Sequence, residues 1–205
     1  ASYPAKDLTI GSSTQTPKVI FNGTVGNSQP FNSITIYGDT EIKRDINSSG
    51  TQTYKGNVTL AGSISGSANT FNNLTIAGTG TSLISGNNKV NGVFTCTQAG
   101  KTLSFEAGKT LTVDGSFTIT GEAASKITLN SQTAGSQWIL TTPAGDANVT
   151  HAIVTDSKST NPFIRPSYST NNGNNTNWIF AANYRWLSNT TGTDWETAAN
   201  WQVES

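Results

Sequence analysis

The feature that most constrains the fold of this chain is an internal repeat. Residues 31–38 read Phe-Asn-Ser-Ile-Thr-Ile-Tyr-Gly, and residues 71–78, about 40 positions later, read Phe-Asn-Asn-Leu-Thr-Ile-Ala-Gly. Related segments, each a short strand-like run followed by glycine, recur at roughly half that interval. A repeat near 20 residues built from short strands is typical of a stacked solenoid and not of a closed globule. We therefore expect long flat faces and two open ends.

The hydrophobic pattern predicts β-strands. It consists of three-residue pulses with apolar ends and usually Thr or Ser at the centre, for example Leu8–Ile10, Ile34–Ile36 and Leu74–Ile76. A strand directs alternate side chains to opposite faces, so each pulse would bury its two ends and expose its hydroxyl. Glycine and asparagine between the pulses tolerate the backbone conformations of sharp corners, and no segment has a convincing helical period.

We predict an all-β fold, a right-handed parallel β-helix. Asn-Gly and Asp-Gly pairs leave a sandwich or barrel built from hairpins as the alternative, but the repeat runs strand, corner and strand in one direction. On this prediction Asn32 and Asn72 lie at the same corner two coils apart, where their amides would form a ladder along the axis.

The composition changes after about residue 136. All five tryptophans follow that point, and the segment 143–177 is irregular, with three prolines and an Asn-rich tract. We predict three parts: regular coils over 1–136, irregular terminal coils over 137–180, and a Trp-rich cap or linking segment over 181–205.

The tryptophans admit two interpretations. Exposed aromatic side chains stack on sugar rings or anchor protein interfaces, whereas buried ones seal a terminal coil. We expect Trp138 and Trp178 to be buried. The aromatic residues of the last segment are expected to pack at a boundary between units, and they form the candidate interface: Tyr184, Trp186, Trp195 and Trp201.

Charge and cysteine content bear on the possible partners. The chain has 12 basic and 12 acidic residues and a formal net charge of zero, which argues against a nucleic-acid or anionic-membrane partner. No apolar run approaches the roughly 20 residues of a membrane span, so we expect no membrane insertion. The single cysteine, Cys96, permits no intrachain disulfide and is expected to be buried in a strand. Because the sequence lacks methionine, we expect either a removed leader or a fragment of a longer chain.

Several segments resemble bacterial surface proteins of the filamentous-haemagglutinin-like and autotransporter-passenger type. The resemblance is carried by glycine-punctuated segments at 21–25, 34–38, 52–60 and 74–78. Residues between 127 and 178 are similar to the closing coils of repeat units in large secreted bacterial proteins. The resemblance implies a right-handed parallel β-helix, export to the cell surface or extracellular space, and adhesive or structural work. It implies no catalytic residues.

The sequence offers little for catalysis. Polysaccharide lyases and pectinases share the β-helix fold, but their sites need several carboxylates on one sheet face, usually with calcium. The densest charged run, from Asp39 to Asp45, mixes both signs and is interpreted as a solvated edge. His151, the single histidine, is expected to be a strand residue. We expect no catalytic, metal or cofactor site. Flat Thr-x-Thr faces can order ice, but here such pairs are unevenly spaced and are not expected to form one plane.

Two functions remain, and they differ in which part of the molecule acts. The first is a structural subunit whose open ends and aromatic C-terminal segment join copies, or neighbouring repeats of one protein, head to tail into an extracellular filament. The second is an adhesin module of a larger surface protein, which would bind a glycan or host ligand through lateral loops within 143–177. A polysaccharide-cleaving enzyme is the third and weakest alternative.

Overall fold

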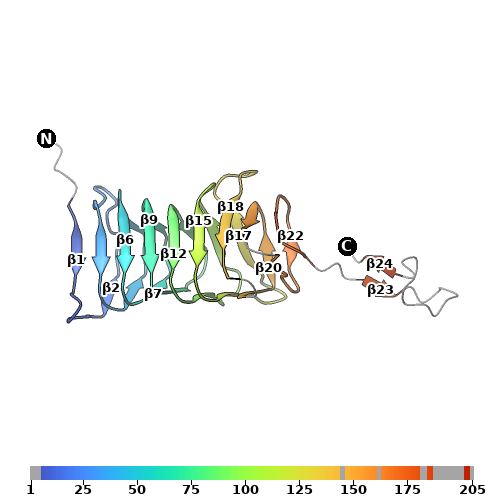
Figure 1. Ribbon diagram of the computed structural model, residues 1–205, viewed down its shortest axis with the longest axis horizontal. Helices are drawn as coiled ribbons and strands as arrows, with labels where there is room; N and C mark the ends of the chain where they lie inside the picture. The colour runs from blue at the N-terminus through green and yellow to red at the C-terminus, as the bar shows by residue number, and fades with distance from the viewer. Residues whose placement is uncertain (1–5, 144–145, 161–162, 181–183, 187–200, 204–205) are drawn as a thin grey trace.

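The computed structural model describes residues 6–143, 146–160 and 163–180, together with the backbone of 184–186 and 201–203. Within these residues the chain forms strands and no helix. Three parallel sheets of eight, seven and seven strands surround one axis, and successive turns of the chain add strands to them in order (Figure 1). The predicted all-β parallel β-helix is therefore confirmed.

The three sheets are numbered by the order in which the chain enters them. Sheet 1 contains, in spatial order, β1 (Leu8–Ile10), β3 (Ile34–Ile36), β6 (Thr51–Tyr54), β9 (Ala68–Phe71), β12 (Asn87–Val90), β15 (Thr110–Val113), β18 (Trp138–Thr141) and β21 (Ser157–Ser159). Sheet 2 contains β2 (Val19–Phe21), β4 (Thr40–Ile42), β7 (Asn57–Leu60), β10 (Asn73–Ile76), β13 (Phe94–Cys96), β16 (Phe117–Thr120) and β19 (Ala147–Thr150). Sheet 3 contains β5 (Ile46–Asn47), β8 (Ile64–Ser65), β11 (Thr81–Ile84), β14 (Thr102–Phe105), β17 (Ile127–Ser131), β20 (Ala152–Val154) and β22 (Thr170–Asn171). A separate antiparallel pair is formed by β23 (Tyr184–Trp186) and β24 (Trp201–Val203).

The three-residue segments with apolar ends form strands because each strand packs these apolar side chains against a continuous core. In β3, Ile34 and Ile36 are fully buried while Thr35 between them stays partly exposed. Burying such an aliphatic side chain contributes roughly 1.5–3 kcal/mol. Aromatic side chains of adjacent coils also stack inside the core, as Tyr54 does on Phe71 with ring centroids 5.2 Å apart.

Coil length varies along the axis. Val58 of β7 pairs with Leu74 of β10, whereas Phe117 of β16 pairs with Ala147 of β19, so the second of these coils is nearly twice as long as the first. The additional residues lie between strands, where lengthening costs little because loop-closure entropy grows slowly with length. A fixed sequence period therefore does not reveal which residues are equivalent in neighbouring coils.

The predicted ladder between Asn32 and Asn72 is consequently wrong. Asn32 precedes β3, where the chain enters sheet 1, whereas Asn72 lies between β9 and β10, where the chain leaves sheet 1 for sheet 2. Nδ2 of Asn32 donates to Oδ1 of Asp7 at 3.0 Å, and the backbone carbonyl of Asn72 accepts from the amide of Gly92 at 2.8 Å. The repeated phrase builds a corner in both places, but the two corners are different.

A column of amide side chains does occur, inside the core. Ile34 of β3 is followed in register by Gln52, Asn69 and Asn88 of the next three coils, and all three amides are buried. Nδ2 of Asn69 donates to Oδ1 of Asn88 at 2.8 Å, and the Tyr54 hydroxyl donates to Oε1 of Gln52 at 2.7 Å. The hydrophobic pattern could not identify this column, because it assigns inward positions to apolar residues.

All three sheets continue into the segment predicted as irregular terminal coils. Strands β18 to β22 extend them in register, with a long connection between β21 and β22. Trp138 and Trp178 are 0% and 7% exposed, so their predicted burial is confirmed. In the described part of the chain, no helix has the length and apolar character needed to cross a membrane.

Candidate functional surfaces

The first coil lies at one end of the described solenoid, at the left of Figure 1. Strands β1 and β2 are the outermost strands of sheets 1 and 2, and no described residue pairs with their outer edges. Their inward side chains, among them Ile10 and Phe21, are only partly buried. In the next coil the equivalent residues, Ile36 and Ile42, are fully buried.

The backbone of this end directs hydrogen-bonding groups outward. Leu8 donates to the carbonyl of Ser33 at 2.9 Å, and the carbonyl of Ile10 accepts from Tyr37 at 3.1 Å. Alternate residues of a parallel strand bond to the same neighbour, so the amide and carbonyl of Thr9 face the open edge. In β2, Val19 and Phe21 bond in the same way to residues of the second coil, which leaves the groups of Ile20 facing outward.

The last described coil is completed by the chain after β22. The amide of Thr176 donates to the carbonyl of Ser157 at 2.8 Å, and the amide of Ile164 donates to the carbonyl of Asn177 at 3.0 Å. Thr176 pairs in parallel with Lys158, and Trp178 with Ile164, so the chain after β22 adds a further partial coil in the same direction. Trp178 is buried in this coil, and its Nε1 donates to Oγ of Ser157 at 3.0 Å.

Asparagine side chains also join this coil to the preceding one. Nδ2 of Asn174 donates to Oδ1 of Asp156 at 2.7 Å, Nδ2 of Asn175 to the carbonyl of Val154 at 2.7 Å, and Nδ2 of Asn177 to that of Ser159 at 2.8 Å. Asn174 and Asn177 also adopt positive φ angles of 52° and 63°, which asparagine tolerates better than most residues. The Asn-rich tract thus satisfies polar groups of the preceding coil.

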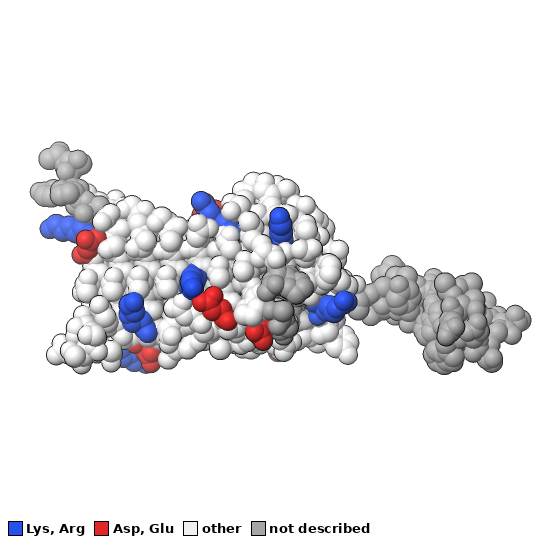
Figure 2. All heavy atoms as spheres, viewed as in Figure 1, with Lys and Arg blue, Asp and Glu red and all other residues white. Residues whose placement is uncertain are grey.

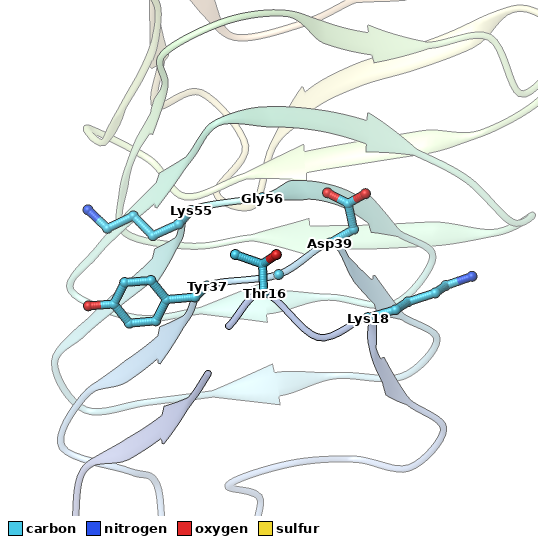
Figure 3. Close-up of a pocket in the computed structure, with 7 residues that line it drawn as sticks. Thr16, Lys18, Tyr37, Asp39, Lys55 and Gly56 are labelled. Atoms are coloured by element: carbon cyan, nitrogen blue, oxygen red, sulfur yellow. The ribbon is translucent and has the colours of Figure 1, made fainter. Parts of the chain in front are cut away.

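A hollow of about 440 Å³ lies at the corner between sheets 1 and 2, close to the open end. Its lining residues are Thr16, Lys18, Tyr37, Gly38, Asp39, Lys55 and Gly56. Figure 3 shows Lys55 and Tyr37 extending to one side and Lys18 to the other. Oδ1 of Asp39 accepts from the amide of Asn57 at 2.8 Å, so this carboxylate holds the next coil in place. The charged groups of the hollow therefore do not converge on one point.

The carboxylates of the densest charged run also point apart. Asp39 lies at the corner between sheets 1 and 2, whereas Asp45 lies between sheets 2 and 3 and accepts from the amide of Ser63 at 2.9 Å. Glu41 forms an ion pair with Lys43 at 3.7 Å. Charges are sparse over the face seen in Figure 2, and no group of three potential metal-binding side chains is present among the described residues.

Two ionisable side chains are buried near the middle of the solenoid. Cys96 is fully buried in β13, as predicted, and burial raises the pKa of its thiol. Lys101 is also fully buried, with its Nζ donating to the carbonyl of Ala61 at 3.3 Å. Burial lowers the pKa of the Lys101 ammonium, because a low-dielectric environment disfavours the charged form.

Threonines form columns on the outer faces of two sheets. The column on sheet 1 is interrupted only by Lys89 and contains Thr9, Thr35, Thr53, Thr70, Thr112 and Thr141. The column on sheet 2 contains Thr59, Thr75, Thr95 and Thr118. These are pulse centres, and the uneven spacing of Thr-x-Thr pairs in the sequence concealed their alignment. Adjacent hydroxyls are separated by about one strand spacing, roughly 4.8 Å.

The candidate interface of the last segment is described only in part. The strands β23 and β24 pair so that Trp186 lies opposite Trp201 and Tyr184 opposite Val203. Trp195 lies outside the described residues.

His151 is a corner residue and not the strand residue that the sequence analysis predicted. It lies between β19 and β20 with a φ of 51°. Its ring stacks on that of Tyr168, with centroids 5.1 Å apart and planes inclined by 11°. Tyr168 also has a φ of 51° and is 77% exposed. The sequence pattern gave no indication of this pair, because its members are brought together by the register of neighbouring coils.

Comparisons of the chain with models of protein families, with curated proteins and with solved structures find no match.

Proposed function

We propose that this protein is a non-enzymatic structural subunit of the cell surface or extracellular space, whose copies join head to tail into a filament. The observation that carries the proposal is the open first coil, where Thr9 and Ile20 direct backbone groups toward an unpaired edge. Strand edges of this kind template further pairing. Contacts between unlike ends of a molecule do not close on themselves, so they generate linear assemblies.

The side chains at this end favour an apolar partner. Leu8, Ile10, Val19, Phe21 and Val25 are half-buried against the core, and a second copy would remove their remaining surface from water. The formal net charge of zero leaves little electrostatic repulsion to oppose association. The location outside the cell rests on the resemblance of the repeats to bacterial surface proteins.

The occupant of the open end would be the C-terminal segment of another copy. That segment carries four aromatic residues, Tyr184, Trp186, Trp195 and Trp201. Addition of a strand to an exposed edge supplies main-chain hydrogen bonds, and side chains on alternate positions supply specificity.

The test is to block the open edge without disturbing the coil behind it. Thr9→Pro with Ile20→Pro removes two outward amides, and proline is tolerated where the amide of an edge strand faces solvent. Thr9→Ala with Ile20→Ala keeps both amides and is the matched control. Sedimentation velocity and electron microscopy should show linear multimers for the natural chain and the control, but monomers for the proline variant. A natural chain that stays monomeric at high concentration would overturn the proposal.

Deletion of residues 181–205 tests the other side of the contact. The deletion variant should remain monomeric alone, yet its intact first coil should still add to the growing end of natural filaments and terminate them. Unchanged multimers after the deletion would exclude the aromatic segment as the occupant.

An adhesin module is the second candidate, favoured by an exposed aromatic side chain within 143–177. Tyr168 is 77% exposed, and large exposed aromatic side chains anchor binding surfaces. Screening the purified chain against glycans and host proteins tests this alternative, and a screen without binding at high protein concentration would exclude it.

A further inference from the structure

We infer that the stacked pair His151 and Tyr168 forms a platform for an acidic saccharide. The inference is independent of head-to-tail assembly and would hold for a monomeric chain. It begins from an unusual backbone: of the five non-glycine residues with positive φ among those described, three are Asn or Asp, and the others are His151 and Tyr168. Histidine tolerates this conformation better than most residues, but for the bulky Tyr168 it is a costly outlier, and such strain is concentrated at functional sites.

The register of the coils presents the rings in a fixed arrangement. Ile127 pairs with Ala152, and Thr150 bridges to Ser167, so His151 and Tyr168 occupy equivalent positions of adjacent coils. The Thr150 hydroxyl lies 3.1 Å from Nδ1 of His151 and helps to orient that ring. One face of Tyr168 therefore rests on a held imidazole, while most of the side chain stays exposed. The apolar C–H face of a sugar ring can stack on an aromatic ring that is held in this way, at little cost in conformational entropy.

A cation lies beside the platform. Lys126 occupies the position equivalent to His151 in the preceding coil, and its Nζ donates to Oγ1 of Thr170 at 2.8 Å, two residues beyond Tyr168. No acidic residue forms an ion pair with Lys126 among the described residues. An ammonium and a hydroxyl next to an aromatic face match a sugar that carries a carboxylate, which is why we infer an acidic and not a neutral saccharide.

The test uses two probes of equal length, an oligomer of four galacturonic acid residues and a neutral oligomer of four galactose residues, in calorimetry and saturation-transfer NMR. The natural chain should bind the acidic probe more tightly than the neutral one. Tyr168→Ala should weaken both by about tenfold or more, whereas Tyr168→Phe should retain binding because it keeps the ring. Lys126→Gln should remove the preference for the acidic probe and leave neutral binding unchanged.

Phe163→Ala is the matched control, since Phe163 is an exposed aromatic residue of the same region but has no described ring partner. It should bind both probes like the natural chain. Equal weakening by Phe163→Ala and Tyr168→Ala would indicate nonspecific aromatic contact and would overturn the inference. Absence of binding by the natural chain at millimolar probe would overturn it as well, whether or not filaments form.

Discussion

The first and last coils of this solenoid bury their apolar side chains to different extents. A stack of coils exposes strand edges and apolar side chains at both ends. At the C-terminal end Ile164 and Trp178 are buried and asparagine side chains bond to the preceding coil, although no described residue pairs with the outer edge of β22. The first coil leaves Thr9 and Ile20 facing outward within the described residues. The two ends therefore differ in how far their apolar side chains are buried, and the end whose apolar side chains are less buried is the one to examine for an apolar partner.

The largest expected effect comes from removing the aromatic side chain at each end. Trp178→Ala should destabilise the last coil by about 3–5 kcal/mol. The substitution opens a cavity and removes the indole N–H that donates to the Ser157 hydroxyl. Phe21→Ala should cost less than half as much, since Phe21 is already partly exposed. Native-state hydrogen exchange at residues 157–159 and 19–21 would measure the two losses separately. Equal losses would contradict the difference between the ends.

A smaller effect is expected from the polar cap. Asn175 donates to Val154 and Asn171 and accepts from the amide of Ser157, so Asn175→Ala should cost about 1–3 kcal/mol by leaving buried groups without partners. Asn22→Ala is the control in the first coil, where Asn22 is exposed and its side chain forms no hydrogen bond to a described residue. Its effect should stay within about 0.5 kcal/mol, as denaturant unfolding of the two variants would show.

Between the two ends, the buried Lys101 lowers the stability of the middle coils. Its lowered pKa means that the folded state disfavours the charged amine, so stability should rise with pH between the lowered pKa and that of a free lysine, about 10.4. Lys101→Met should stabilise the middle coils by about 1 kcal/mol. That gain should be largest below the lowered pKa and shrink as the pH approaches 10, a trend that thermal unfolding across pH would detect. A destabilised variant would show that the bond to Ala61 outweighs the cost of burial.

The sequence predicted the fold class well because burial in a strand has a simple signature. Pulses such as Ile34–Ile36 alternate with period two, and their ends are buried as that pattern requires. The register was not predictable, because coil length nearly doubles between the coil that pairs Val58 with Leu74 and the one that pairs Phe117 with Ala147. Strands with polar inward residues, such as β12 with Asn88, lack the pulse altogether.

The candidate surfaces were less predictable for the same reason. His151 and Tyr168 belong to successive coils and become neighbours only through the pairing of Thr150 with Ser167. Nothing local to either residue marks the contact. The unpaired edges of β1 and β2 among the described residues, by contrast, follow from the solenoid fold itself, and the structure adds which backbone groups face outward.

The smallest expected effect concerns the one carboxylate that secures the open end. Oδ1 of Asp7 accepts from the Ser33 hydroxyl at 2.7 Å and from Nδ2 of Asn32 at 3.0 Å, and these bonds hold the pKa of Asp7 below its usual value. Because the folded state favours the charged form, the stabilisation is present above the pKa of a free aspartate, about 3.9, and is lost as the pH falls through the lowered value. Asp7→Asn should therefore weaken protection of the first coil slightly at neutral pH and have no effect in strong acid, where both side chains are uncharged. NMR titration would measure the pKa of the Asp7 carboxyl. Hydrogen exchange at residues 8–10, at neutral pH and in strong acid, would measure the protection of the first coil. A difference that persists in strong acid would show that Asp7 acts through geometry and not through charge.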